Sequence, residues 1–308
     1  MAKKKLYEIE YFAVSDIGKF RLNHEDNFLL PTGDLLIENQ IDKINPRVLF
    51  EGNLKPKFKN ALHFAVADGM GGHKAGEIAS SIVVNELKRR FFKWRPATMD
   101  KAVEEYKKFI FELNSAVHAF GKTSNDYYNL GSTLASLIFC KNKIVSVNVG
   151  DSRVYSFTDG VLRRLSKDHT EGQMLIDIGI INNEDNNLYK VRNSLTRHIG
   201  MSDVDFDALN YISSEQEVSD SDIFLICSDG LTCIVNEEQI SKIMGEGKAK
   251  GLSLIGNELL ETCLDSNFSE KAGCDNITII LFKVLIKDKT KKFWRNFFNK
   301  FKLGFRKT

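Results

Sequence analysis

Residues 132–158 read STLASLIFCKNKIVSVNVGDSRVYSFT and indicate the fold class more directly than any other part of the chain. Three apolar runs of strand length are separated by short polar breaks, and the third run ends at Asp159-Gly160, a pair typical of a tight hairpin turn. Strands joined by such short turns pair antiparallel, because a parallel pairing needs a much longer crossover. The stretch therefore predicts antiparallel strands at 132–140, 143–149 and 153–158.

The rest of the chain extends this pattern in both directions. Further strands are expected at 7–14, 26–30, 62–67, 222–228 and 277–286. Apolar residues at helical spacing predict helices over 78–91 and 103–117, and a third helical region is expected at 237–266. Hairpins outnumber β-α-β crossovers in this order. That favours an α+β protein, with antiparallel sheets flanked by helices, over a doubly wound parallel sheet.

The composition is that of a globular protein with a sizeable core. The 308 residues are 43% hydrophobic and 27% charged, and no run of about 18 apolar residues could span a membrane. The N-terminal residues lack the apolar centre of a signal peptide, so a cytoplasmic location is expected. The five cysteines include no Cys-x-x-Cys pair, which argues against a disulfide framework or a cysteine zinc site.

The net charge of +2 conceals a strongly basic C-terminal segment. Residues 287–308 carry nine Lys or Arg against Asp288 alone, so the remaining 286 residues are mildly acidic. An acidic body argues against nucleic acid as a partner. Within the segment, aromatic residues recur every four positions, at Phe293, Phe297, Phe301 and Phe305. As an amphipathic helix it could lie on an anionic membrane surface or dock on a partner protein. It could equally pack back on its own domain or remain solvated.

Acidic residues recur where apolar strands begin or end. They are Glu25, Asp26, Asp68, Asp151, Asp229 and Asp275. Any one of them alone is most simply a turn or cap residue, but carboxylates at several strand ends converge if the strands share a sheet edge. Convergent carboxylates repel one another unless a cation lies between them, and oxygen ligands without His or Cys select Mg²⁺ or Mn²⁺. Two such ions can activate a water and clamp a phosphoryl group.

The motifs around these residues occur in a recognisable order. They are Arg21-Leu22-Asn23-His24-Glu25-Asp26, Asp68-Gly69-Met70-Gly71-Gly72-His73, Gly131-Ser132-Thr133, Gly150-Asp151-Ser152-Arg153, Asp168-His169-Thr170, Leu195-Thr196-Arg197, Ser228-Asp229-Gly230-Leu231 and Asp275-Asn276. Together they resemble the PPM-type, or type 2C, metal-dependent protein serine/threonine phosphatases in their bacterial form. The resemblance extends over roughly residues 7–286 in collinear order, and the combined motifs are far more specific than each fragment.

The resemblance implies a four-layer α-β-β-α sandwich, in which helices cover both outer faces of a central antiparallel β-sandwich. It implies a centre of two Mn²⁺ or Mg²⁺ ions at one end of the sandwich. Asp68 would bridge the ions, Asp229 and Asp275 would hold the first, and the Gly69 carbonyl would hold the second. Asp151 would help to hold a weaker third ion.

The resemblance also implies the roles of three residues around the ions. Glu25 and Asp26 would hold metal-bound waters, and Arg21 would grip the substrate phosphate. Water would attack phosphoserine or phosphothreonine directly, without a phosphoenzyme, to reverse the action of a bacterial Ser/Thr kinase on its phosphoprotein substrates. A mobile flap over 166–205 would influence the choice of substrate.

The sequence departs from the wider family at two positions. Met70 follows Asp68-Gly69 where animal members have His, so the acid that protonates the leaving group is unassigned, with a metal-bound water or His73 as candidates. Bacterial members commonly share this Met. Cys233 stands where many relatives have an acid, which predicts weaker occupancy of the third metal site.

The domain organisation follows from these assignments. Residues 1–286 are expected to form the phosphatase domain, and 287–308 a separate basic aromatic tail. Residues 31–60 are expected to be a loop or insertion, because they are polar and contain three prolines. Two alternative functions fit the sequence less well. A pseudophosphatase would lack ligand residues, whereas Arg21, Asp68, Asp229 and Asp275 are all present. A two-metal nuclease is disfavoured by the acidic body and by the motif order.

Overall fold

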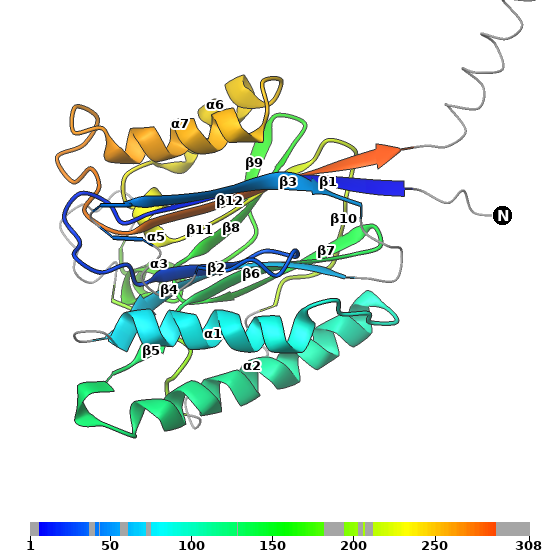
Figure 1. The fold of residues 1–308 in the computed structure, drawn as a ribbon. Coiled ribbons are helices and arrows are strands. Elements are labelled where there is room, and N and C mark those ends of the chain that lie inside the picture. Colours follow the sequence, from blue (N-terminus) through cyan, green and yellow to red (C-terminus); the bar gives the residue numbers. More distant parts are fainter. Residues whose placement is uncertain are drawn as a thin grey trace, which may run out of the picture.

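Two six-stranded antiparallel sheets form the centre of the molecule (Figure 1). The computed structural model describes residues 6–36, 41–42, 44–55, 61–71, 75–127, 129–181, 194–202, 206 and 212–287. The first sheet has the order β3 (Arg47–Leu54), β1 (Leu6–Asp16), β12 (Ile277–Lys287), β11 (Ile223–Cys227), β8 (Arg153–Thr158) and β9 (Val161–Arg164). The second has the order β10 (Gln216–Glu217), β7 (Lys143–Val149), β6 (Leu134–Cys140), β4 (Leu62–Met70) and β2 (Asp26–Leu29), and β5 (Gly131–Ser132) pairs with the end of β4.

Helices cover the outer faces of both sheets, which gives the four layers expected from the sequence (Figure 1). The long helices α1 (Ala75–Phe91) and α2 (Met99–Gly121) lie on the second sheet, and α6 (Glu237–Gly247) and α7 (Leu252–Leu264) lie on the first. Shorter helices complete the described chain: η1 (Asn125–Tyr127), α3 (Glu171–Asp177) and α5 (Asp229–Thr232). The predicted α+β sandwich is thus confirmed. No helix within the described ranges is long and apolar enough to cross a membrane.

Three apolar cores hold the four layers together, one between each pair of neighbouring layers. Alternate side chains of β4 belong to two of these cores. Phe64 and Val66 belong to the core between the sheets, whereas Ala65 and Ala67 face α1 and α2. Across the central core, the Phe64 ring stacks on that of Phe282 in β12 at a centroid distance of 4.2 Å. Burial on both faces fixes the strand register, because a shift by one residue would exchange the two sets of side chains.

The stretch 132–158 forms strands as predicted, but it spans both sheets. β6 and β7 pair as a hairpin in the second sheet, and β8 pairs with β9 in the first, through the Asp159-Gly160 turn. Both turn residues adopt positive φ angles, 52° and 82°, which suits a tight hairpin. The break at 150–152 is therefore a crossover from one sheet to the other, and it carries Asp151 to the end of the sandwich.

The segment 31–60, expected to be a loop, contains the edge strand β3. It pairs antiparallel with β1, with Val14 opposite Leu49 and Tyr11 opposite Gly52. Alternate residues Val48 and Phe50 pack against the core between the sheets, while their neighbours are exposed. The helical region at 237–266 is likewise two helices, because the chain turns at Gly251 with a φ of 112° that other residues rarely adopt.

Candidate active site

Five of the predicted acidic residues gather at one end of the sandwich, where strands of both sheets begin or end. Asp26 begins β2 and lies directly opposite Asp68 of β4 in the antiparallel register. Asp229 begins α5, two residues after the end of β11, and Asp275 lies two residues before β12, the strand that pairs with β11. Asp151 reaches the same place from the crossover between β7 and β8. Residues more than 200 positions apart in sequence thus share one acidic centre.

The carboxylates of this centre raise one another's pKa. Burial, followed by the negative charges of Asp26, Asp229, Asp151 and Asp275, holds the pKa of Asp68 well above its usual range. Burial and the charge of Asp275 raise the pKa of Asp229 to about 6. Asp26 is buried and the other four carboxylates are partly buried, and like charges this close together are stabilised when protons or cations neutralise them. The centre is therefore suited to binding cations.

The donor atoms of the centre suit a hard divalent cation. They are carboxylate oxygens, the ligands that Mg²⁺ and Mn²⁺ prefer. The Oδ1 atom of Asp229 is buried and has no hydrogen-bond partner, so it has an unused electron pair inside the cluster. Within the part of the chain that the structure describes, no three His, Cys, Asp or Glu side chains stand close enough together to hold a metal ion as they are arranged. The centre therefore suits a divalent cation because of its oxygen donors and the unpaired Oδ1 of Asp229, and not because of a preformed ligand geometry.

Gly69 follows Asp68 at a point where backbone segments approach very closely. A Cβ atom at this position would lie 1.9 Å from the carbonyl oxygen of Gly76 and 2.9 Å from that of Glu25. The Gly69 amide donates a hydrogen bond to the same Glu25 carbonyl at 3.1 Å. Residue 69 must therefore be glycine for α1 and the Glu25 segment to pack against the end of β4.

Arg21 lies at the mouth of the acidic centre, on the connection between β1 and β2. Its Nη2 atom donates to Oδ2 of Asp275 at 2.7 Å, and Nη1 is 3.8 Å from Oε2 of Glu25. The Arg21 side chain is 44% exposed, so it remains accessible from solvent. A guanidinium group in this position can accept an anionic ligand beside the carboxylates.

Ser228 links the two sheets beneath the acidic centre. Its hydroxyl donates to Oδ2 of Asp26 at 2.7 Å and accepts from the Thr278 amide at 3.0 Å. His24 contacts the backbone of Asp26, with its Nδ1 3.0 Å from the Asp26 carbonyl oxygen. Its Nε2 lies 3.1 Å from Oγ of Ser15. Burial lowers the pKa of His24 to about 4, so the ring is neutral near pH 7. These contacts fix Asp26 in one orientation.

Asn276 holds the Arg21-bearing connection in place, a role that the sequence did not suggest. Its Nδ2 donates to the carbonyl oxygens of Ile17 at 3.0 Å and Asn23 at 3.2 Å. Its Oδ1 accepts from the Glu25 amide at 2.8 Å. The position directly after Asp275 in an acidic motif was the only sequence signal, because the partners lie about 250 residues away in the chain.

The motifs at 150–153 and 168–170 are in direct contact in the structure. Arg153 donates to both carboxylate oxygens of Asp168, with Nη2 2.7 Å from Oδ2, and Arg164 pairs with the same carboxylate. The His169 amide donates to the Gly150 carbonyl at 2.9 Å, and the Gly150 amide donates to His169 Nδ1 at 3.1 Å. The start of the predicted flap is therefore tied to the crossover that carries Asp151.

The structure places both residues that depart from the wider family, Cys233 and Met70. Cys233 lies beside the centre, with Sγ 3.6 Å from Oδ2 of Asp229. Met70 ends β4, where it pairs with Gly131. His73, a candidate for the leaving-group acid, lies outside the described residues, as do 182–193 and 203–205 of the predicted flap and 288–308 of the tail.

Comparisons with known proteins identify the family of the chain. Residues 55–250 match the family model described as protein phosphatase 2C. The chain is 33% identical over 223 residues to the serine/threonine phosphatase stp of Listeria monocytogenes, covering 70% of this chain and 82% of the relative. It is 30% identical over 282 residues to the serine/threonine protein phosphatase PstP of Mycobacterium tuberculosis, covering 90% of this chain and 45% of the relative.

The fold agrees with solved structures of the same group. The crystal structure of Mycobacterium tuberculosis PstP superimposes with a TM-score of 0.68 at 27% identity, covering 90% of this chain and 98% of that one. The PstP catalytic domain in complex with two manganese ions gives a TM-score of 0.67 at 26% identity, with coverage of 91% and 99%. The chain belongs to the protein phosphatase 2C family. It is a metal-dependent serine/threonine protein phosphatase.

Proposed function

We propose that this chain hydrolyses phosphoserine and phosphothreonine in proteins by direct attack of water, with two divalent cations held at the acidic centre. The single observation that carries the proposal is the convergence of Asp26, Asp68, Asp229 and Asp275, from both sheets, beside an accessible Arg21. When bound, the two cations would lower the pKa of a water and neutralise charge on the phosphoryl group.

The proposed ligand roles are those that the resemblance to the family implies. Asp68 would help to hold both ions, and it lies opposite Asp26 and close enough to Asp229, Asp151 and Asp275 for their charges to raise its pKa. Asp229 and Asp275 would hold the first ion, and the Gly69 carbonyl would hold the second. Asp151 would help to hold a third, weaker ion, with the neutral thiol of Cys233 limiting its occupancy.

The remaining residues would bind and orient the reactants. Arg21 would exchange its contact with Asp275 for two oxygens of the substrate phosphate, which match its planar fork. Asp26, fixed by Ser228, and Glu25, held through its amide by Asn276, would accept hydrogen bonds from waters in the centre. Met70 cannot donate a proton, so a water of the centre or His73 would protonate the leaving serine or threonine oxygen.

Two wider assignments belong to the same proposal. Residues 1–286 would form the phosphatase domain, including the insertion 31–60 and the flap 166–205. The enzyme would act in the cytoplasm on substrates of a Ser/Thr kinase. The basic aromatic tail 287–308 would bring it to an anionic membrane surface or to a partner protein.

A direct test measures release of phosphate from a phosphothreonine peptide. Hydrolysis should require Mn²⁺ or Mg²⁺, stop on addition of EDTA, and be lost in Asp229→Ala. Asp126→Asn, at an exposed site on η1, serves as the matched control and should remain active. Activity that persists in EDTA, or in Asp229→Ala, would contradict the proposed mechanism.

A further inference from the structure

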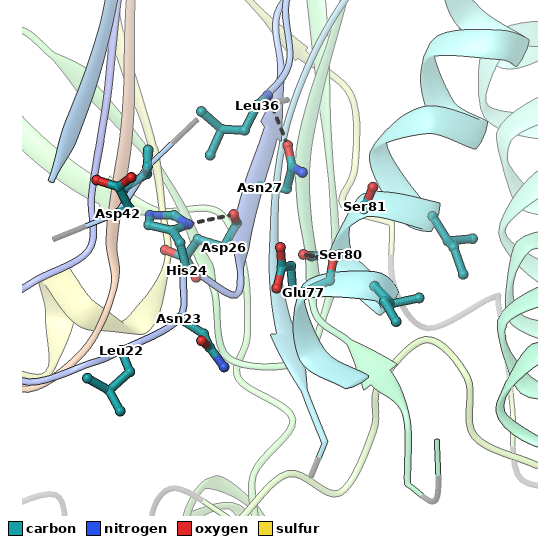
Figure 2. A pocket seen from close by; sticks show the side chains of 13 residues that line it. Leu22, Asn23, His24, Asp26, Asn27, Leu36, Asp42, Glu77, Ser80 and Ser81 are labelled. Atoms are coloured by element: carbon teal, nitrogen blue, oxygen red, sulfur yellow. Dashed lines mark hydrogen bonds between the residues drawn. The ribbon is translucent and has the colours of Figure 1, made fainter. Parts of the chain in front are cut away.

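A pocket of about 250 Å³ lies beside the acidic centre, between the connection that precedes β2 and the first turns of α1 (Figure 2). Figure 2 shows Asp42 and His24 to one side of β2, and Ser80 and Ser81 of α1 to the other. Its volume lies below the range of about 300–1,000 Å³ that holds a drug-sized ligand. The pocket is therefore of a size for one side chain rather than for a whole small molecule.

The pocket adjoins the site where the phosphate would bind. Asp26 lines it and also belongs to the acidic centre. Leu22, which lines its mouth, directly follows Arg21 and is 81% exposed, and Phe20 on the other side of Arg21 is 69% exposed. A peptide whose phosphoresidue contacts Arg21 would pass over these two apolar side chains on its way to the pocket.

The charged side chains among the described residues that line the pocket are acidic. Asp42 and Glu77 line it together with Asp26, and none of the described lining residues is Lys or Arg. His24 contributes no positive charge near pH 7, because burial lowers its pKa to about 4. The remaining walls include apolar side chains, among them Leu36 and Ile78. Acidic groups in partly apolar walls suit a side chain with a methylene stem and a cationic end.

We propose that this pocket is a specificity subsite for a Lys or Arg side chain of the phosphoprotein substrate, a few residues from the phosphoserine or phosphothreonine. The inference rests on the proposed function, and it adds a preference that the acidic centre alone does not provide. Asp42 attracts the cationic end, while the apolar walls hold the stem. Leu22 and Phe20 carry the intervening peptide from Arg21 to the pocket.

Asp42 offers the most informative substitution. Its Oδ1 accepts hydrogen bonds from the amides of Ile44 at 2.8 Å and Asn45 at 2.7 Å. In Asp42→Asn the side-chain oxygen can keep both bonds, so the local turn is preserved and only the charge is removed. Asp126→Asn is the matched control, because it removes the same charge from an exposed position on η1.

The experiment measures kcat/KM with Mn²⁺ for phosphothreonine peptides that carry a single Arg at each flanking position in turn. Each is compared with the peptide in which citrulline, a neutral isostere, replaces that Arg. At one position or two adjacent positions, the wild-type enzyme should prefer Arg by about fivefold, the magnitude of a partly exposed ion pair. Asp42→Asn should reduce this ratio below about twofold, whereas Asp126→Asn should retain it.

The ratio of kcat/KM for the Arg peptide to kcat/KM for the citrulline peptide separates the possible outcomes. Both values come from the same enzyme preparation, so a smaller fraction of folded protein lowers both and leaves the ratio unchanged. Equal rates for Arg and citrulline peptides at every position would overturn the subsite and leave the proposed function intact. A preference that Asp42→Asn retains in full would also overturn it. If the wild-type enzyme hydrolyses none of the peptides, the proposed function fails and the subsite with it.

Discussion

The Ser228 hydroxyl donates a 2.7 Å hydrogen bond to the Asp26 carboxylate, joining the end of β11 in one sheet to the start of β2 in the other. Both residues are buried, with Asp26 only 3% exposed. Ser228→Ala would leave a buried carboxylate oxygen without its donor, at a cost of about 1–3 kcal/mol in the free energy of unfolding. Urea denaturation followed by circular dichroism measures this cost. The exposed Ser253→Ala on α7 should unfold at nearly the wild-type urea concentration, and equal midpoints for the two variants would refute the assigned role.

The substitution Asp229→Asn should raise the stability of the metal-free protein and abolish phosphatase activity. Without metal its carboxylate is buried near Asp275 and Asp68, with Oδ1 unpaired, so Asp229→Asn should stabilise the metal-free protein by an amount on the order of 1 kcal/mol. The same variant should lose phosphatase activity and bind fewer Mn²⁺ ions in titration calorimetry. Thermal unfolding in EDTA tests the first effect. A variant that is less stable than the wild type in EDTA, yet binds Mn²⁺ normally, would show that Asp229 is structural.

Gly69 should tolerate no side chain. In Gly69→Ala the added Cβ would meet the Gly76 carbonyl at 1.9 Å, so α1 must move away from the end of β4. We expect a loss of about 1–3 kcal/mol in unfolding free energy, together with a large fall in kcat. The control is Gly245→Ala in α6, where the added Cβ would meet Phe157 at an ordinary 3.8 Å. That substitution should stabilise the helix by up to about 1 kcal/mol, and similar behaviour of the two variants would argue against the close approach.

His63 should make the fold sensitive to acid. It is buried between β4 and α2, with Nε2 2.9 Å from the Tyr106 hydroxyl, and burial lowers its pKa to about 3. The unfolded chain binds a proton at this residue below pH 6.5 and the folded protein does not. The free energy of unfolding should therefore fall by about 1.4 kcal/mol for each pH unit between pH 6 and 4 from this residue alone.

The variant His63→Gln isolates this contribution, because it has no titrating group. Its unfolding free energy should depend less steeply on pH over the same interval, and the histidine NMR signals of the wild type should show His63 still neutral at pH 5. Identical pH dependence of the two proteins would contradict the prediction.

The tail 287–308 should bind anionic vesicles when fused to green fluorescent protein. Its basic residues supply attraction to the surface, and its four regularly spaced phenylalanines supply apolar area for insertion. Replacing all four with Ala keeps the charge and should weaken vesicle binding by about tenfold or more. A fusion that stays diffuse in cells and ignores anionic vesicles would exclude the membrane surface as its target.

The sequence was sufficient for the layers but not for the assignment of strands to sheets. Runs such as 143–149 and 153–158 are apolar enough to be recognised, yet nothing local shows that the chain changes sheets at Gly150. β3 was missed because its inward positions include Gly52, which weakens the alternation, and because prolines flank the segment. Every second residue of β3 is exposed and the others are only partly buried, so its hydrophobic pattern is weak.

The acidic residues of the site were recognisable because each stands at a strand end beside a Gly, Asn or Ser. The residues that position them were not. Ser228 and Asn276 act on partners across 202 and about 250 positions, and a hydroxyl or amide carries no sign in the sequence of which distant carboxylate or amide it will bind. The pocket beside Asp26 was also unpredictable, since its walls come from segments that meet only in the folded chain.

The position of β12 has a consequence for synthesis of the enzyme. It is the last strand of the described chain, yet it lies inside the first sheet, between β1 and β11. A nascent polypeptide from which β12 has not yet emerged lacks both this strand and the adjacent Asp275, so its first sheet has a gap at the centre. Phosphatase activity can therefore develop only after Asp275 and β12 have been synthesised and have emerged, and premature termination before Ile277 should yield a product for proteolysis rather than a partly active enzyme.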